Sequence, residues 1–590
     1  MRAAIGLVLA ASVCLPSGVR ADNVTCDVAI IGGGPGGAHT AYKLATKKLT
    51  AGPVCLFEMS DHLGGRVGNN EKVGFSGTPY VNDGVTVKNS GTVGTGGYRM
   101  YFNQYTYRLG LELAKLGQTG QLTFRSQNSF SRISGVENRG FNASLGEDRY
   151  FTYNNGGVAK PFAPLYHSPI NDNDFWKVLL CGPQVPVNGN DVPQYQEMDI
   201  PGLGNMTAAD YLEWVADNVI SPGNGPEVAQ YFLDTWRFRG DFDPGNDAVS
   251  YLDYNAKDFT GGLVIYPIPS FQPYFEIMQA QILAKGGRVY LNEKVLSVNS
   301  QSSGPRYKLV TSKNTVTANS VIIATTHKAL GPGGITGNVI GAITAQPHFQ
   351  YVQAVNAVTV THQFGDGANP NTGWWHGDIT YPTGSQLLGP QLSPTANPIR
   401  RTTNNFMIPG EDLGGGNDFT DTLFFNNTNE LPLTDYHDHI NTARSVYNDQ
   451  TEAVENWIAL HDAGGDAAVN RQILKSLRLM YPKVFTGIPA DEPQIRATQF
   501  TVHKPAWYIL RQGALASGIT NDTLFEWSLN PLSGERVYLV GDAWRPDESG
   551  WSDAAYKGSV YVLNRYFGAK IDPKEPSKIR CIDGDIVDPD

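Results

Sequence analysis

Short, continuous runs of apolar residues dominate the hydrophobic pattern of this chain. "CDVAII" begins at Cys26, "PVCLFE" ends at Glu58, and "NSVIIAT" and "VYLVGD" begin at residues 319 and 537. Strands without polar alternation are typical of a parallel sheet that is covered on both faces. Helical periodicity follows in "AHTAYKLATKK" and in "WSDAAYKGSVYVLNRYF". The pattern therefore predicts an α/β fold.

The rest of the chain predicts a second domain that is interleaved with the first. "AADYLEWVADNVI" and "PEVAQYFLDTWRF" have helical character, and "QAVNAVTVTHQF" has that of a strand. Two further helices are predicted at "ARSVYNDQTEAVENWIALH" and "VNRQILKSLRLMY". We expect dinucleotide-binding parts at 23–115, 255–330 and 495–570, a helical substrate part at 116–254, an α+β substrate-binding domain at 331–494 and a polar tail at 571–590.

The first apolar run leads into Gly32-x-Gly34-x-x-Gly37, and a predicted helix follows. In such a turn the first glycine allows a tight bend, the second admits a pyrophosphate, and the third lets the helix pack on the strand. The next strand ends at Glu58, where an acidic residue commonly binds a ribose hydroxyl. Arg66 follows in "LGGR" and suits phosphate oxygens. A surface carboxylate and a surface salt bridge are the alternatives for these last two residues.

These stretches, together with "GTGGYRMYF" and the C-terminal "RVYLVGDAWRPDESGWSDAAYKGSVYVLNRYFG", resemble the flavin-dependent amine oxidase family. The family includes L-amino acid, monoamine and polyamine oxidases. The resemblance extends from about Val24 to Gly568 and implies a discontinuous FAD-binding Rossmann-like domain. It implies that the following residues bind FAD: Gly32, Gly34, Pro35, Gly36, Gly37, Glu58, Gly65, Arg66, Gly96, Gly97, Tyr98, Val295, Gly541, Asp542, Gly550 and Trp551.

The resemblance also assigns roles near the flavin. Val295 would contact the adenine through its backbone, and Asp542 would hold the FAD. Gly550 and Trp551 would open the last helix beside the isoalloxazine ring. The N-terminus of that helix is a second place where a charged ring can be stabilised.

Three residues are implied to act on the substrate. Arg99, in "GGYRMYF", matches the arginine with which L-amino acid oxidases bind the substrate carboxylate, a task that suits a guanidinium fork. Trp551 matches the aromatic wall of the substrate site. Tyr381 is a looser match to a second carboxylate ligand, and an ordinary core aromatic is its alternative.

The sequence departs from the family at one position. A lysine that is thought to aid the reaction with oxygen is expected on a strand of the substrate domain, and our alignment places Asn356 there. No lysine occurs between Lys328 and Lys475, so shifting the alignment does not supply one. The assignment as an oxidase is weakened accordingly.

The N-terminus predicts secretion. Arg2, an apolar run and small residues before Ala21 form a signal peptide over residues 1–21. Sequons at Asn23, Asn142, Asn205, Asn426 and Asn521 agree with a glycoprotein. No later run is long and apolar enough to span a membrane.

Cysteines and charge limit the partners. Cys26, Cys55, Cys181 and Cys581 remain after the signal peptide, which permits two disulfides, with buried free thiols as the alternative. The net charge of −11 disfavours nucleic acid. Histidine and cysteine spacings predict no metal site. The oligomeric state stays open, with a homo-oligomer among the options.

Three functions remain in view. The first is a secreted L-amino acid oxidase that converts an L-amino acid, oxygen and water into a 2-oxo acid, ammonia and hydrogen peroxide. The second resembles flavin-dependent polyunsaturated fatty acid isomerases, which return the hydride to the substrate and need no oxygen. The third is a non-catalytic secreted flavoprotein, because a fold does not determine a function. In the first two, the partner is a small carboxylate-bearing molecule.

Overall fold

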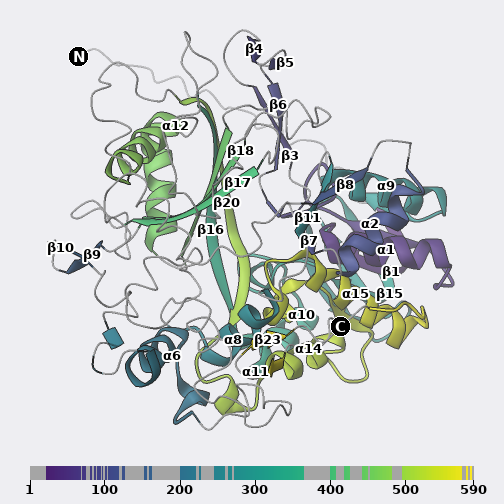
Figure 1. Ribbon diagram of the computed structural model, residues 1–590. Helices are drawn as coiled ribbons and strands as arrows, with labels where there is room; N and C mark the ends of the chain where they lie inside the picture. Colours follow the sequence, from purple (N-terminus) through teal and green to yellow (C-terminus); the bar gives the residue numbers. More distant parts are fainter. Residues whose placement is uncertain are drawn as a thin grey trace, which may run out of the picture.

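The described part of the computed structural model contains two large sheets and the helices that pack against them (Figure 1). The described residues are 22–67, 70–74, 80–82, 85–87, 90–94, 96–97, 100–101, 104–117, 122–126, 152–155, 158–161, 200–220, 223, 225–226, 245–258, 264–268, 271–364, 399–406, 418–425, 442–449, 452–480, 495–573, 580–582 and 585–587. The predicted signal peptide, the sequons at 142 and 426, and the predicted helix at 227–238 lie outside these ranges.

A seven-stranded sheet contains the apolar runs. Its strands are β1 (Asp22–Ile31), β2 (Val54–Phe57), β12 (Arg288–Tyr290), β13 (Val295–Ser300), β14 (Tyr307–Thr311), β15 (Asn314–Ile323) and β21 (Val537–Leu539). β12, β2, β1, β15 and β21 are parallel neighbours, and β14 and β13 extend the sheet antiparallel. The predicted mixed α/β sheet, mostly parallel, is therefore confirmed.

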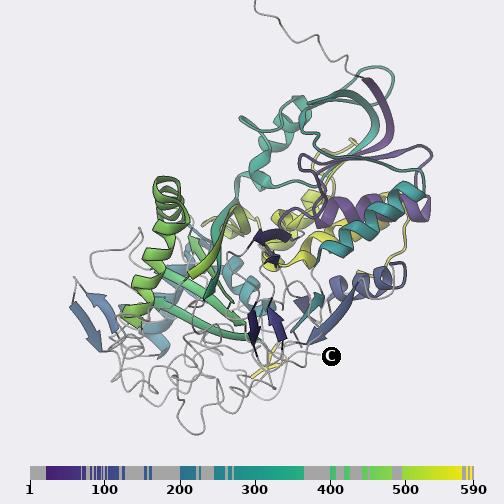
Figure 2. The same ribbon diagram turned by 90° about the horizontal axis from the view of Figure 1, so that it is seen from above.

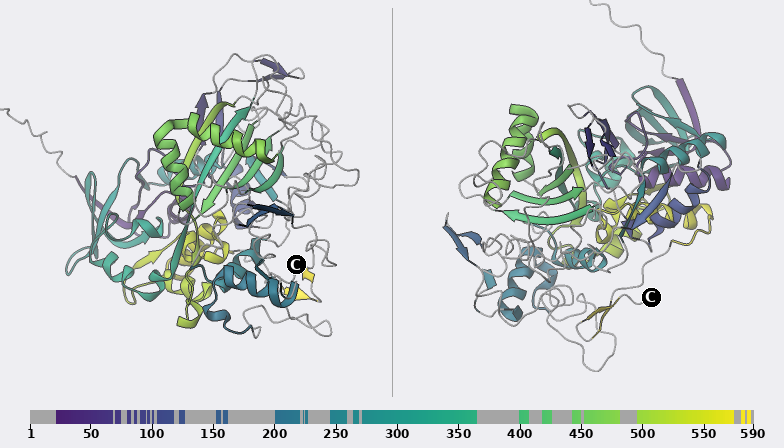
Figure 3. Two further views of the ribbon diagram at one scale, coloured as in Figure 1. Left: turned by 90° about the vertical axis from the view of Figure 1, so that its left-hand side faces the viewer. Right: turned by 45° about the horizontal axis from the view of Figure 1, so that its top comes forward.

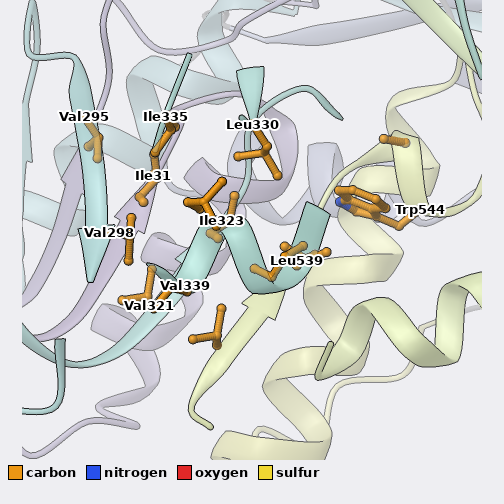
Figure 4. Packing of buried hydrophobic residues seen from close by; sticks show 14 of the residues in the cluster. Ile31, Val295, Val298, Val321, Ile323, Leu330, Ile335, Val339, Leu539 and Trp544 are labelled. Atoms are coloured by element: carbon orange, nitrogen blue, oxygen red, sulfur yellow. The ribbon is translucent and has the colours of Figure 1, made fainter. Parts of the chain in front are cut away.

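Both faces of this sheet are covered, as its continuous apolar strands require. α1 (Pro35–Lys47), α2 (Tyr105–Ala114), α9 (Gln272–Ala284) and α15 (Ser552–Phe567) contribute to the core on one face. Figure 2 shows α1 and α9 side by side, and these two helices are in contact. On the other face, Ile31, Val321 and Ile323 pack with Val298 and Trp544 (Figure 4). α10 (Asn338–Thr344), α11 (Pro347–Gln350) and α14 (Asn521–Leu529) lie around this second core.

A five-stranded antiparallel sheet lies beside the first. Its order is β17 (Ile399–Phe406), β18 (Asp418–Phe425), β19 (Thr442–Asp449), β16 (Val352–Phe364) and β20 (Ile495–Leu510). α12 (Glu452–Met480) lies across it (Figure 3) and bends at Gly465, whose φ is 58°. The strand predicted at 353–364 is confirmed as β16.

The predicted helix over 443–461 is partly wrong. Residues Thr442–Asp449 form strand β19, and the helix begins only at Glu452. β19 hydrogen-bonds to β16 on one side and to β18 on the other. These long-range strand pairs outweigh the weak local preference for helix.

A group of helices lies around α8, which contacts β20 of the five-stranded sheet. α6 (Ala208–Val215) starts at a capping box in which Thr207 and Asp210 bond to each other's backbone N–H. It continues as a π-helix, Ala216–Ile220, and packs against α8 (Ala248–Asp258). The short helices are Leu203–Asn205, His327–Ala329 (η6), Leu515–Ser517, Asp542–Trp544 (η9) and Pro546–Glu548 (η10). None of the helices within the described ranges has the length and apolar character of a membrane span.

Short strands complete the fold. They are β3 (Asn70–Gly74), β4 (Tyr80–Asn82), β5 (Val85–Val87), β6 (Ser90–Gly94), β7 (Met100–Tyr101), β8 (Thr123–Ser126), β9 (Thr152–Asn155), β10 (Val158–Pro161), β11 (Val264–Ile268), β22 (Arg580–Ile582) and β23 (Asp585–Val587). They pair as β3–β6, β4–β5, β9–β10, β22–β23 and β7–β11–β8.

The structure decides two features that the sequence left open. Cys26 and Cys55 form a disulfide, so they are not free thiols. Asn521 is buried, and its side-chain N–H donates to Asp253 at 2.7 Å. The amide nitrogen that a glycan would occupy is thus enclosed, so the sequon at Asn521 does not support the prediction of a glycoprotein. Asn23 and Asn205 are exposed.

Candidate functional site

One cavity of about 520 Å³ opens at the carboxyl ends of the parallel strands and extends to the five-stranded sheet. Its first end is lined by Glu58, Glu293 and Val295, from the residues that follow β2 and precede or begin β13. Its second end is lined by the following residues of α8, β16, β20 and the start of α15: Tyr254, Ala357, Thr359, His503, Trp507 and Trp551. The glycine turn after β1 lies between the two ends of this single cavity.

The three glycines of the turn have the three predicted surroundings. Gly32 has a φ of +100°, which side-chain-bearing residues rarely adopt. A Cβ on Gly37 would lie 1.9 Å from the carbonyl oxygen of Gly32, so only glycine lets α1 begin this close to the turn. A Cβ on Gly34 would meet no protein atom within 4 Å. Gly34 therefore exposes its backbone to the cavity, as a phosphate-binding position must.

Two helices begin at this cavity without a side-chain cap. Gly34 is the N-cap residue of α1 and Trp551 is that of α15. At neither position does a side chain accept a hydrogen bond from the N–H groups of the first turn. The two helices pack against each other, with the Ala555 carbonyl oxygen 3.3 Å from the place of a Cβ on Gly36. Uncapped N–H groups and the positive ends of both dipoles thus favour an anionic group in the cavity.

Glu58 is fixed at the first end by the turn itself. The Gly33 N–H donates to its Oε2 at 2.7 Å, and the Ser60 N–H and O–H donate to its Oε1 at 2.8 and 2.9 Å. A carboxylate offers about four acceptor positions, so Oε2 retains a lone pair for a ligand. Glu58 is only 8% exposed but lines the cavity, which suits a buried hydroxyl-binding role.

Arg66 joins three distant parts of the chain. Its guanidinium forms an ion pair with Asp542 at 2.5 Å and donates to the carbonyl of Ala506, on β20. Both Arg66 and Asp542 line the cavity. The predicted phosphate ligand is therefore held in place by the predicted FAD-binding aspartate, which follows β21.

A buried ionic cluster lies beneath the start of α15. Lys557 forms ion pairs with Asp553 at 2.8 Å and with Glu548 at 3.2 Å, and Arg545 pairs with Glu548 at 3.1 Å. The N–H and hydroxyl of Thr106 donate to Asp553 at 2.9 and 3.1 Å. Burial raises the pKa of Asp553, although the Lys557 ammonium opposes this. These bonds hold both ends of the Glu548–Asp553 segment, which carries Gly550 and Trp551.

The second end is compact and aromatic. A Cβ on Gly550 would lie 3.5 Å from the Tyr254 hydroxyl and 3.7 Å from Cβ of Trp507, so α8, β20 and the start of α15 meet there. β20 also places the buried His503 in the cavity wall, beside Ala357 of β16. Sequence reasoning missed His503. A histidine within the strand-like "FTVHKPAWYIL" was the available signal.

The predicted residues fall into three groups. Those that line the cavity are Gly32, Gly34, Pro35, Gly36, Glu58, Gly65, Arg66, Gly96, Gly97, Val295, Gly541, Asp542, Gly550 and Trp551. Gly37 lies behind the turn and packs against Gly32. Tyr98, Arg99 and Tyr381 lie outside the described residues.

The residue aligned with the expected lysine does not line the cavity. Ala357 and Thr359 line the cavity from β16, whereas Asn356 is buried but does not line it. Among the described lining residues, the lysines are Lys294 and Lys328, both exposed. No group of acidic, histidine or cysteine side chains in the described parts of the chain could hold a metal ion.

A comparison with known protein families supports dinucleotide binding at the glycine turn and at Glu58. Residues 30–93 match the family model of the NAD(P)-binding Rossmann-like domain. The match contains the glycine turn, Glu58 and Arg66. No curated protein matches the chain. The matched domain and the cavity built on it indicate a dinucleotide-dependent oxidoreductase.

Proposed function

We propose that this protein is a FAD-dependent oxidoreductase of the amine oxidase type, and specifically an L-amino acid oxidase. One observation carries the proposal: a single cavity joins the dinucleotide-binding turn to an enclosed aromatic end. A cofactor bound at the turn would place its reactive half beside Trp551, Trp507 and Tyr254. Such a site can enclose a small substrate against a flat ring.

The residues present fit FAD. Glu58 would bind the adenosine ribose, the backbone at Val295 would contact the adenine, and Gly34 with the two uncapped helices would accept the pyrophosphate. Arg66 and Asp542 would hold the segment between the phosphates and the ring. FAD would supply the chemistry by accepting a hydride from the substrate Cα at N5 and passing two electrons to oxygen.

The protein's own task is to orient the amino acid and exclude water. Arg99 would bind the carboxylate as a bidentate ligand, with Tyr381 as a second contact. Trp551 would form the wall beside Cα. Water would then hydrolyse the imino acid to a 2-oxo acid and ammonia, with release of hydrogen peroxide.

Anaerobic bleaching tests this function. The purified yellow protein is mixed with L-amino acids, with amines and with unsaturated fatty acids, and air is then admitted. We expect loss of the oxidised flavin absorbance with L-amino acids, and peroxide after air enters. Failure of every amino acid to bleach bound FAD rejects the proposal. Arg99→Lys should raise the KM for amino acids but leave FAD binding unchanged.

The second candidate is a flavin-dependent isomerase of polyunsaturated fatty acids. The observation that favours it is the β16 wall, whose described lining residues, Ala357 and Thr359, do not include the lysine expected for an oxidase. An arginine serves a fatty carboxylate equally well. Conjugated-polyene absorbance that develops anaerobically, without peroxide after air enters, identifies this reaction.

Secretion is proposed with either activity. A buried disulfide suits a chain that folds in an oxidising compartment, and the sequons at Asn23 and Asn205 are exposed. Expression in a secreting cell should give extracellular protein that loses mass on enzymatic deglycosylation. Protein retained inside the cell, without glycan, contradicts this proposal.

A further inference from the structure

The second end of the cavity holds a group suited to exchange protons near neutral pH. His503 is 8% exposed and faces the cavity from β20, paired in register with Ala357 of β16. Among the described residues at this end, the ionisable side chains are His503 and Tyr254. An ordinary phenol titrates near pH 10, whereas an ordinary imidazole titrates at about 6.5. Imidazole is therefore the chemical group at this end that is best suited both to accept and to donate a proton.

The charged groups on the elements packed against β20 are mostly engaged with one another. Glu455 of α12 forms an ion pair with Lys504, and Asp542 of η9 forms one with Arg66. On η10, Glu548 pairs with Arg545 and Lys557, and Asp547 lies 3.9 Å from Arg545. Asp253 of α8 accepts a hydrogen bond from the Asn521 side chain. α8 also contributes Tyr254, and β16 contributes the uncharged Ala357 and Thr359. The side chains of β3, which also contacts β20, lie outside the described ones. These carboxylates are thus held in ion pairs or hydrogen bonds, which leaves the imidazole as the group that we expect to exchange a proton at this end.

The proposed oxidation needs such a group twice. An amino acid arrives as an ammonium ion, whose nitrogen has no lone pair to form the C=N bond as hydride leaves Cα. That nitrogen must first lose a proton. Later, oxygen becomes hydrogen peroxide by taking two electrons and two protons, of which the reduced cofactor supplies both electrons and one proton. The second proton has to come from elsewhere.

We propose that His503 is a catalytic residue that accepts the proton of the substrate ammonium and returns it as peroxide forms. An ammonium N–H bond breaks and an imidazole N–H bond forms. The freed nitrogen lone pair then forms the C=N bond as the Cα–H bond breaks, and bound FAD would take up the hydride. In the second half-reaction, the imidazolium N–H breaks and a peroxide O–H forms. Protons balance over the cycle. The inference rests on the proposed L-amino acid oxidase function.

Single turnover with a pH indicator tests the assignment. The FAD-loaded protein is bleached anaerobically with one equivalent of an L-amino acid in weak buffer, and oxygen is then added. In the wild-type protein His503 should retain the substrate proton. The solution should therefore gain few protons when the flavin is bleached and lose few when oxygen reoxidises it. His503→Gln and His503→Asn should release about one proton for each flavin bleached and take it up again with oxygen. Bound FAD absorbance and the melting temperature report whether each variant is folded.

The pH profile gives a second readout. We expect the wild-type bleaching rate to rise through the imidazole range, and His503→Gln to lose this step and fall about 100-fold at neutral pH. Added imidazole should restore part of the rate. His461→Gln is the matched control, because His461 stacks on Phe500 of the same strand but does not line the cavity. It should behave as the wild type.

These experiments distinguish a wrong role for His503 from a wrong oxidase function. A folded His503→Gln protein that keeps both the pH step and the wild-type proton count overturns the role of His503. A wild-type protein that no amino acid bleaches overturns the oxidase function instead.

Discussion

Gly34 and Gly37 belong to one turn, but a methyl group added at each would meet different surroundings. At Gly34, where φ is −67°, it would point into open cavity, and at Gly37 it would strike the Gly32 carbonyl. We expect Gly34→Ala to leave the melting temperature of the FAD-free protein unchanged but to weaken FAD binding about 100-fold, or about 2.7 kcal/mol. Gly37→Ala should lower the melting temperature itself. Calorimetry and flavin-fluorescence titration separate the two effects, and normal FAD affinity in Gly34→Ala would remove the phosphate site from this turn.

Asp247 predicts a pH dependence of stability. Burial raises its pKa from 3.8 to about 6, although N–H groups of Ser250 and Val249 bond to it. Between these two values the folded protein holds a proton that the unfolded chain has lost, so this group lowers stability as pH rises. Asp247→Asn keeps an acceptor for both N–H groups. Relative to wild type, the variant should gain about 3 kcal/mol of unfolding free energy between pH 4 and 6. Denaturant titrations across this range measure it.

His327 gives the control of opposite sign. Burial lowers its pKa from 6.5 to about 4, so the folded protein binds a proton less readily than the unfolded chain and stability rises with pH across that window. Relative to wild type, His327→Gln should lose unfolding free energy as pH rises from 4 to 6.5. If the two variants shift in the same direction, the assignment of these groups is wrong.

α15 carries one buried and one exposed basic residue that form ion pairs, so the two can be compared within one helix. Lys557 is buried between Asp553 and Glu548, whereas Arg565, on the last turn, pairs with Glu526 at the surface. Lys557→Met leaves two buried carboxylates with less compensation and should cost about 3–5 kcal/mol of unfolding free energy. Arg565→Met should cost less than about 1 kcal/mol. Chemical denaturation checks both, and equal costs would show that burial does not set the value of this cluster.

At the element level, the sequence predicted what depends on local pattern. The β1–α1–β2 unit follows from continuous apolar runs, a GxGxxG turn and helical periodicity, and α15 follows from its own periodicity. Most of β19 was assigned to a helix because its eight residues are locally ambiguous and form a strand only through pairing with β16 and β18. The prediction of two helical pieces, at 443–461 and 469–481, agrees with the two parts of α12 on either side of the non-helical Gly465.

In the candidate site, too, the sequence predicted the residues that depend on local spacing and missed what depends on long-range contacts. Glu58 and the glycines could be named because their spacing within one βαβ unit is typical of a dinucleotide-binding turn. The ion pair between Arg66 and Asp542 joins residues 476 positions apart, and no local pattern encodes it. His503 was missed because its place in the cavity depends on the register of β20 against β16, which includes a β-bulge next to Ala357.

At the scale of the whole molecule, the cavity lies between two sheets that also share a buried hydrophobic cluster, to which β16 and β20 contribute Ala354 and Tyr508. The parallel sheet supplies the dinucleotide-binding turn, and β16 and β20 supply the far wall. Arg66 spans the two, because it contacts Asp542 after β21 and the carbonyl of Ala506 in β20. A ligand that occupies the full cavity must therefore couple the stabilities of both sheets.

This coupling distinguishes FAD from a nucleotide that binds at the Rossmann-like end alone. Bound ligand present at about 1,000 times its Kd adds about 4 kcal/mol of unfolding free energy, so removal of FAD should lower the melting temperature markedly. Hydrogen exchange locates the effect: FAD should slow exchange in β1, β2 and α1 and also in β20, where the Tyr508 N–H bonds to Ser549 beside the Gly550–Trp551 turn. ADP, which lacks the flavin half, should protect the first set and leave β20 as in the FAD-free protein. At the same FAD concentration, Gly34→Ala should lose the protection of β1, β2 and α1 and also that of β20. If FAD and ADP protect the same amides, the far half of the cavity is not the flavin site, and the substrate would have to be sought elsewhere.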